Sequence, residues 1–328
     1  MRLEFQKNIA SSQFTLPFVS TLVILLWFIL PTAHGGETYH LQHGLWPLIP
    51  DNFLVGTTGR FVALALGALG VYLVAELTNA NVLLRISSRM LSSTLAVLLG
   101  AILCLHLPTP GHIVMICSIL TFFTMFSTYQ APSPVSSLIT YMILSMGAMI
   151  FPKLIYLVPF YWCLQAYLRA LSLRCVVASV LGILSPYWLL FLYMFFQEDG
   201  AIAFVYICHQ FVEFELPDYS SLHLTDILIF AFVLVFFLSG MINFYINSFR
   251  DKTRTRIIFN TIIAHAFVSI LFLALQPQFF HTLLPLLVVD SALVGGHFIA
   301  LTYNKFSHIY CIVMLICIVA LVAAQIIL

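Results

Sequence analysis

The chain has 328 residues, of which 62% are hydrophobic and 8% are charged, and its formal net charge is +1. Soluble domains carry about 25% charged residues, so this composition excludes a soluble globular protein, and its aromatic richness does not fit a disordered chain. We therefore predict one integral membrane domain over residues 1–328.

Eleven mainly apolar runs follow one another along the chain, and each approaches the length of about 20 residues that a membrane helix needs. The runs lie near 14–31, 57–76, 90–107, 112–129, 135–151, 153–168, 174–196, 225–248, 256–276, 279–302 and 308–327. Short connectors marked by proline leave ten spans as the alternative count. The pattern predicts an all-α fold, a polytopic transmembrane helical bundle.

The basic residues predict the orientation of this bundle. If the N-terminus is cytoplasmic, only Arg60 and Lys153 of the 13 basic residues fall in outward connectors. The inward ones are Arg2, Lys7, Arg85, Arg89, Arg169, Arg174, Arg250, Lys252, Arg254, Arg256 and Lys305. This split obeys the positive-inside rule, so we predict a cytoplasmic N-terminus and an outward C-terminus.

The two longest connectors, residues 32–56 and 197–224, both face outward in this topology. The first contains Glu37, His40 and His43. One interpretation is a metal site at His40 and His43, or a carboxylate general base at Glu37 with imidazole neighbours. The alternative is an interfacial segment whose aromatic and His side chains lie at headgroup level. The second connector predicts a helix in the membrane interface, which either lines a cavity or caps the bundle.

Two further positions are candidates for function. Arg60 is a lone cation at the outward end of its span, where it could grip a phosphate or pair with Glu37 or Asp51. Asp290 lies inside an apolar run, and intramembrane acids are rare and costly.

The surroundings of Asp290 in the sequence suggest partners for it. His297 follows seven residues later on the same helix face, about 10 Å along the axis, and His265 in the preceding run is another candidate partner. Gly295 and Gly296 would let a neighbouring helix approach closely. We interpret Asp290 as a proton relay, an ion site or a catalytic acid, and the structural alternative is a polar pair that fixes helix packing.

No phosphate-binding loop, dinucleotide fingerprint, zinc-protease helix, hydrolase nucleophile elbow or haem motif occurs in the chain. We therefore expect neither nucleotide-driven pumping nor nucleotide-dependent redox chemistry. The cofactor is not identified by the sequence, and a divalent metal at the first outward loop is the one candidate.

Three stretches resemble a family of multi-pass inner-membrane proteins of the Bacteroidota whose activity is not known. They are residues 79–85, residues 151–187 with Gly182-Ile-Leu-Ser-Pro-Tyr187, and the closing Leu284-Pro-Leu-Leu span. This resemblance implies a bacterial cytoplasmic (inner) membrane location. A looser similarity, to polyprenyl-phosphate-dependent membrane glycosyltransferases, implies an acidic pair after the first span, but here Glu37 is followed only distantly by Asp51.

Our leading functional prediction is a protein that handles a lipid-linked envelope glycan or lipid from the outward face. Glu37 would then be a base or a metal-binding acid, Arg60 a phosphate clamp, and Asp290 with His297 an internal polar site. The alternatives are a proton- or ion-coupled transporter that uses Asp290, His297 and His265, and a non-catalytic subunit of an envelope assembly. We expect the bilayer and a lipid-linked substrate as partners and no nucleic acid, and the sequence identifies no protein partner.

Overall fold

The computed structural model of the protein describes residues 12, 14–31, 44–86, 88–196, 200–211 and 216–328. It is all-helical, with 84% of the residues in helices. This confirms the predicted all-α fold class, and the length and apolar character of its helices are consistent with a multi-pass membrane protein.

Among the described residues, seven helical stretches are long and apolar enough to cross a bilayer. They are Gly56–Asn81, Pro110–Ser127, Leu173–Phe195, Leu224–Arg250, Thr253–Leu275, Pro277–Leu301 and Lys305–Ile327. Three apolar helices are shorter, namely Thr15–Ile29, Met90–Ala101 and Pro134–Ile150. A helix of 15 residues such as Thr15–Ile29 is only about 22 Å long, less than the hydrocarbon thickness of about 30 Å.

The described residues divide into two compact units: those within 12–31, 51–112 and 217–328 form the first, and those within 44–50 and 113–216 form the second. The first contains α2 (Thr15–Ile29), α3 (Gly56–Asn81), α4 (Met90–Ala101), α10 (Leu224–Asn247), α11 (Thr253–Leu275), α12 (Phe280–Leu301) and α13 (Lys305–Ile327). The second contains α6 (Pro134–Ile150), α7 (Val158–Tyr167), α8 (Leu173–Phe195) and α9 (Gly200–His209). The remaining helix, α5 (Pro110–Ser127), begins in the first unit and continues into the second.

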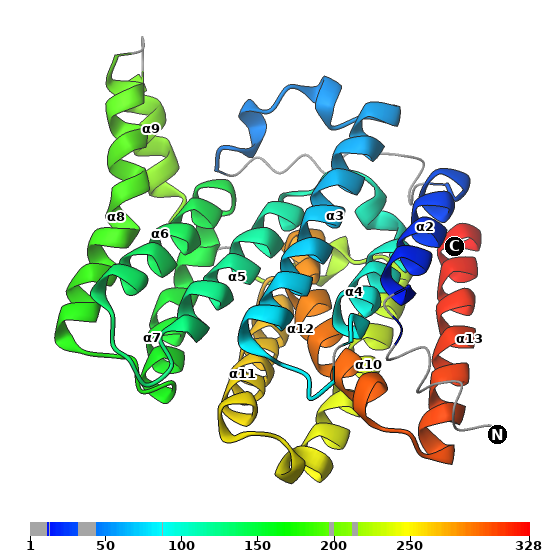
Figure 1. Ribbon diagram of the computed structural model, residues 1–328. Helices are drawn as coiled ribbons and strands as arrows, with labels where there is room; N and C mark the ends of the chain where they lie inside the picture. The colour runs from blue at the N-terminus through cyan, green and yellow to red at the C-terminus, as the bar shows by residue number, and fades with distance from the viewer. Residues whose placement is uncertain (1–11, 13, 32–43, 87, 197–199, 212–215) are drawn as a thin grey trace. The chain divides into compact units, whose positions relative to one another are not determined.

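Helix α12 forms the centre of the first unit, where it packs against α4, α10 and α11 (Figure 1). Within its most apolar window 94% of the residues are buried, against 17% for α13. Helices in lipid associate through close packing rather than through the exclusion of water. The side chains of α12 are therefore held by protein on every side, and α13 presents most of its surface outward.

Two glycines on α12 allow this close packing. A Cβ atom on Gly240 of α10 would lie only 2.9 Å from the Cα of Gly295. A Cβ atom on Gly296 would lie 2.9 Å from the Cα of Leu91 on α4. The predicted close approach at Gly295 and Gly296 is confirmed, and the two glycines admit two different helices.

Helix α2 packs on α4 and ends beside the short 3-10 helix η4 (Leu103–His106). Trp27 is 1% exposed, and its indole stacks on the imidazole of His106 with ring centroids 4.0 Å apart. Gly100 of α4 makes room for Val23, whose Cγ1 would lie 2.8 Å from a Cβ added there. These contacts fix the position of α2 beside α4.

In the second unit, α6 packs along α8. Serine side chains cap both helices, since Ser133 accepts from the backbone N–H of Ser136 and Ser172 accepts from that of Cys175. Lys153, which we expected in an outward connector, lies in the 3-10 helix η5 (Pro152–Leu157) and is 2% exposed. The reason is that η5 packs against α6 instead of forming a free loop. Helix α9 occupies part of the second predicted long connector.

Candidate functional site

Three carboxylate–imidazole pairs lie along α12. Each pair joins one side chain of α12 to a side chain of α10, α11 or the connector between them, and all six residues are at most 8% exposed. The pairs are His281–Asp226 at 3.5 Å, Asp290–His265 at 2.7 Å and His297–Asp251 at 3.4 Å.

The central pair is the shortest and the most buried. Nδ1 of His265 lies 2.7 Å from Oδ2 of Asp290, and both residues are 0% exposed. Oδ1 of Asp290 has no hydrogen-bond partner among the described residues. A buried carboxylate oxygen without a partner is costly, so this oxygen is the atom of the pair that is available to a proton or a ligand.

Asp290 also lies midway along its span. Ten residues precede it in α12 and eleven follow it, so it is about 15 Å from either end of the helix. Half of the hydrocarbon thickness of a bilayer is also about 15 Å. The sequence placed Asp290 inside a span, and the helix bounds put it at the middle of a helix long enough to cross a bilayer. Ionisable groups at a bilayer midplane face the largest desolvation cost.

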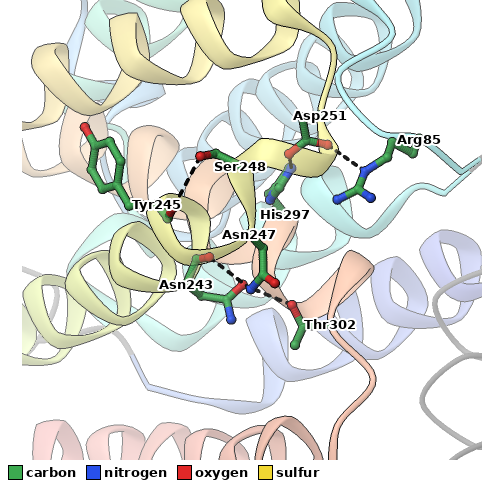
Figure 2. A network of polar contacts seen from close by, with 8 residues as sticks. All are labelled: Arg85, Asn243, Tyr245, Asn247, Ser248, Asp251, His297 and Thr302. Atoms are coloured by element: carbon green, nitrogen blue, oxygen red, sulfur yellow. Dashed lines mark hydrogen bonds and ion pairs between the residues drawn. The ribbon is translucent and has the colours of Figure 1, made fainter.

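Polar interactions continue at the C-terminal end of α12, as Figure 2 shows. Nε of Arg85 donates to Oδ1 of Asp251 at 2.6 Å, and Nε2 of His297 lies 3.4 Å from Oδ2 of the same carboxylate. Burial alone would raise the pKa of Asp251, but the nearby His297 imidazole, together with Arg85, outweighs it and lowers that pKa below its ordinary value. Asp251 is therefore ionised at neutral pH.

A hydrogen bond joins the C-terminal ends of α10 and α12 beside this carboxylate, and a second one lies within α10. Oγ1 of Thr302 donates to Oδ1 of Asn243 at 3.0 Å, and Nδ2 of Asn247 donates to the carbonyl oxygen of Asn243 at 3.2 Å (Figure 2). The His297 ring packs edge-on against the rings of Phe259 and Phe244, with centroids 4.5 and 5.4 Å away. His297 thus has one polar contact and an otherwise apolar setting.

The connector after α3 and the connector after α10 meet at the Arg85–Asp251 pair, and the adjoining helix ends are also in contact. Besides the Arg85–Asp251 pair, Nη2 of Arg254 donates to Oδ1 of Asn81 at 3.2 Å. Helix α3 ends just before Arg85 with Val82 in the left-handed region at φ 48°. Such a conformation is unfavourable for a β-branched residue, and it occurs in the connector that carries Arg85, so this segment is constrained.

At the opposite end of α12, His281 faces Asp226. Asp226 lies in the first turn of α10, where its Oδ2 accepts the backbone N–H of His223 at 3.1 Å and its Oδ1 lies 3.5 Å from Nε2 of His281. The N-terminus of a helix favours a carboxylate through its dipole. Asp226 is therefore a buried helix-capping residue at 1% exposure.

The candidate residues from the sequence have different places in the structure. Asp290 and His297 share a face of α12, as predicted, but they contact different partners: His265 is the partner of Asp290, and Asp251 is the partner of His297. Nη2 of Arg60 donates to the carbonyl oxygen of Leu30 at 2.6 Å, so its guanidinium caps the C-terminus of α2. The metal and general-base predictions for Glu37, His40 and His43 lie outside the described residues.

Sequence reasoning missed Asp251 and His281 as site residues. Asp251 stands inside the basic connector 250–256, which reads as a topology anchor, and His281 is nine residues from Asp290, on the opposite helix face. Neither residue stands at a sequence spacing from other polar residues that would indicate a site. Their roles follow only from helices that are adjacent in space.

No known family model matches this chain, and no characterised protein is significantly similar to it. The resemblances suggested by the sequence therefore stay predictions.

Proposed function

We propose that this chain is a proton-coupled membrane transporter in which Asp290 and His265 bind and release the coupled proton. The observation that carries the proposal is the 2.7 Å contact between these two side chains at the middle of the most buried candidate span. Ionisable residues at this depth mark ion and proton paths in membrane proteins. Oδ1 of Asp290, which has no hydrogen-bond partner among the described residues, supports the same role.

A proton suits this pair better than a metal cation because the pair offers few ligands. Zinc sites in proteins use about four ligands and calcium sites about six to eight. No group of three or more His, Cys, Asp or Glu side chains with metal-binding geometry occurs in the described part of the chain. One proton, by contrast, needs a single acceptor and changes the net charge of the pair by one.

The two terminal pairs extend the polar positions toward both ends of α12. His281 and His297 lie about 14 Å and about 10 Å from Asp290 along the helix axis. Proton transfer requires hydrogen-bond contact or a bridging water, so the central pair cannot exchange protons directly with either terminal pair. Exchange with each face would follow water entry or a change in helix packing, which is the behaviour that alternating access requires.

The proposal also includes the orientation of the chain and the number of its membrane spans. We place the N-terminus in the cytoplasm and the chain in a bacterial inner membrane, with about eleven crossings of the bilayer and ten as the alternative. The distribution of the basic residues supports this orientation. The short helix α4 is followed by η4, so the two together span residues 90–106.

The test measures proton movement in liposomes that contain the purified protein and an internal pH-sensitive dye. An inside-negative potassium diffusion potential is applied, and amino acids, sugars, nucleosides or carboxylic acids are added outside as separate classes. We expect one class to drive internal acidification in the wild type, and we expect Asp290→Asn and His265→Gln to abolish it.

Asp218→Asn is the matched control, because Asp218 is an exposed acid in a connector. It should leave the acidification unchanged. An equal dye response in the wild type and Asp290→Asn, or no response to any solute class, would refute proton coupling at this pair. The lipid-linked glycan function depends on Glu37, outside the described residues, and it stays a prediction.

A further inference from the structure

A groove of about 280 Å³ lies between α2, α3 and α4, far along the chain from the residues that pair with α12. Its floor includes Val23 and Trp27, which are 8% and 1% exposed, and its rim includes Ile24 and Tyr72, which are 44% and 59% exposed. The groove is therefore closed on one side by packed helices and open on the other.

Small residues on α3 make the groove wide. Gly67, Ala68 and Ala75 line it, and a Cβ atom on Gly67 would meet the nearest side-chain atom, Leu99 Cδ1, at 3.6 Å. That distance is ordinary van der Waals contact, so the absence of a side chain at Gly67 leaves free volume rather than relieving a clash. From Leu64 to Glu76 the α3 wall runs about 18 Å, which suits an extended hydrocarbon chain.

One end of the groove carries charges of both signs. Glu76 and Asn79 in the last turns of α3 and Arg89 at the N-terminal cap of α4 all line it. Arg60 holds the opposite end of α2 against the start of α3, so α2 and α3 run antiparallel and the start of α2 lies at the charged end. Glu76 and Arg89 form no side-chain hydrogen bond or ion pair with the described residues.

We propose that this groove binds one phospholipid with an amine headgroup, of the phosphatidylethanolamine type. Its acyl chain lies along the apolar floor, its ammonium group contacts Glu76, and its phosphate contacts Arg89 and Asn79. Glu76 and Arg89 line the same end of the groove and do not pair with each other. Their opposite charges are complementary to a headgroup that carries both an ammonium and a phosphate. An anionic headgroup would satisfy only Arg89.

The headgroup contacts must provide the selectivity of this site. An acyl chain gains little by leaving bulk lipid for the groove, because lipid tails are as apolar as the groove walls. Charges at the edge of the hydrocarbon region interact more strongly than charges in water. The site should therefore discriminate between headgroups and be nearly indifferent to chain composition.

Native mass spectrometry of the purified protein, incubated with equal amounts of phosphatidylethanolamine and phosphatidylglycerol, tests the proposal. We expect the wild type to retain one phosphatidylethanolamine with a preference of about fivefold, as for a partly exposed ion pair. Glu76→Gln should remove the preference, and Arg89→Gln should reduce retention of both lipids. Ala68→Trp should block the groove.

Two controls separate the groove from general effects. Leu69→Trp adds the same bulk at the next position of α3, outside the groove, and Arg174→Gln removes an exposed basic residue of α8. Both should bind lipid as the wild type does. If Ala68→Trp does not fold, Glu76→Gln and Arg89→Gln decide the question.

Equal retention of the two lipids by the wild type, or wild-type retention by Glu76→Gln and Arg89→Gln, overturns the proposal. Asp290→Asn should keep the lipid preference, so failure of lipid binding and failure of proton coupling are distinguishable.

Discussion

The Asp290–His265 pair should make the largest pairwise contribution to stability among the three carboxylate–imidazole pairs of α12. Removal of one partner from a buried charged pair leaves the other without compensation, which costs about 3–5 kcal/mol. We therefore expect Asp290→Ala and His265→Ala to lower the free energy of unfolding by about that amount each. The double variant should cost clearly less than the sum, because no isolated charge remains.

The distances in the structure set the expected coupling energy. At 2.7 Å, His265 and Asp290 form a short buried hydrogen bond, and we expect a double-mutant cycle to give about 2–3 kcal/mol. The 3.5 Å separation of His281 and Asp226 is too long for a strong hydrogen bond, so the same cycle there should give about 0.5 kcal/mol.

Unfolding in mixed detergent micelles with increasing dodecyl sulfate, followed by circular dichroism, gives the free energies for both cycles. Asp290→Asn provides an intermediate case, because an amide oxygen still accepts from His265 Nδ1 and the loss should be only about 1–2 kcal/mol. If Asp290 and His265 couple no more strongly than Asp226 and His281, the arrangement of α11 against α12 described above is wrong.

Three further predictions concern Asp251, Val82 and Gly295. Asp251→Asn should cost about 1.5–3 kcal/mol at neutral pH, through loss of the charged hydrogen bond to Arg85. The pKa of Asp251 is lower in the folded protein than its ordinary value of 3.8, so the stability that Asp251 contributes is fully present above pH 3.8 and is lost as the pH falls through the folded pKa. Below that folded pKa, the melting temperatures of the wild type and Asp251→Asn should converge. Val82→Gly should stabilise the protein by about 0.5–1 kcal/mol in thermal unfolding, since relief of the left-handed strain exceeds the added chain entropy; a lower melting temperature would contradict this. Gly295→Ala should cost about 1–3 kcal/mol because its Cβ would overlap the ring of Phe236, and unchanged stability would show that α10 and α12 are less tightly packed.

The composition and the periodic apolar runs were enough to predict a helical membrane protein, because a backbone in lipid must satisfy its own hydrogen bonds and the helix does so locally. Each of the eleven runs contains a helix, and seven of the helical stretches meet the length and apolarity of a membrane span. Asp290 could also be singled out, since the cost of an intramembrane carboxylate is a property of one residue and its neighbours in the chain. The close approach of a neighbouring helix at Gly295 and Gly296 could be predicted as well, because glycine has no side chain to keep the helices apart.

The partner of Asp290 was decided by the tertiary structure. Along the sequence, His297 shares its helix face, yet about 10 Å of helix separates the two, and a side chain cannot bridge that rise. His265 is 25 residues earlier, and the antiparallel packing of α11 on α12 brings its imidazole within 2.7 Å. The same holds for Asp251, whose carboxylate meets Arg85 from a connector 166 residues away in the chain. Hydropathy reports whether a segment enters the membrane, but hydrogen bonds between helices depend on which faces meet, and only the packed structure determines that.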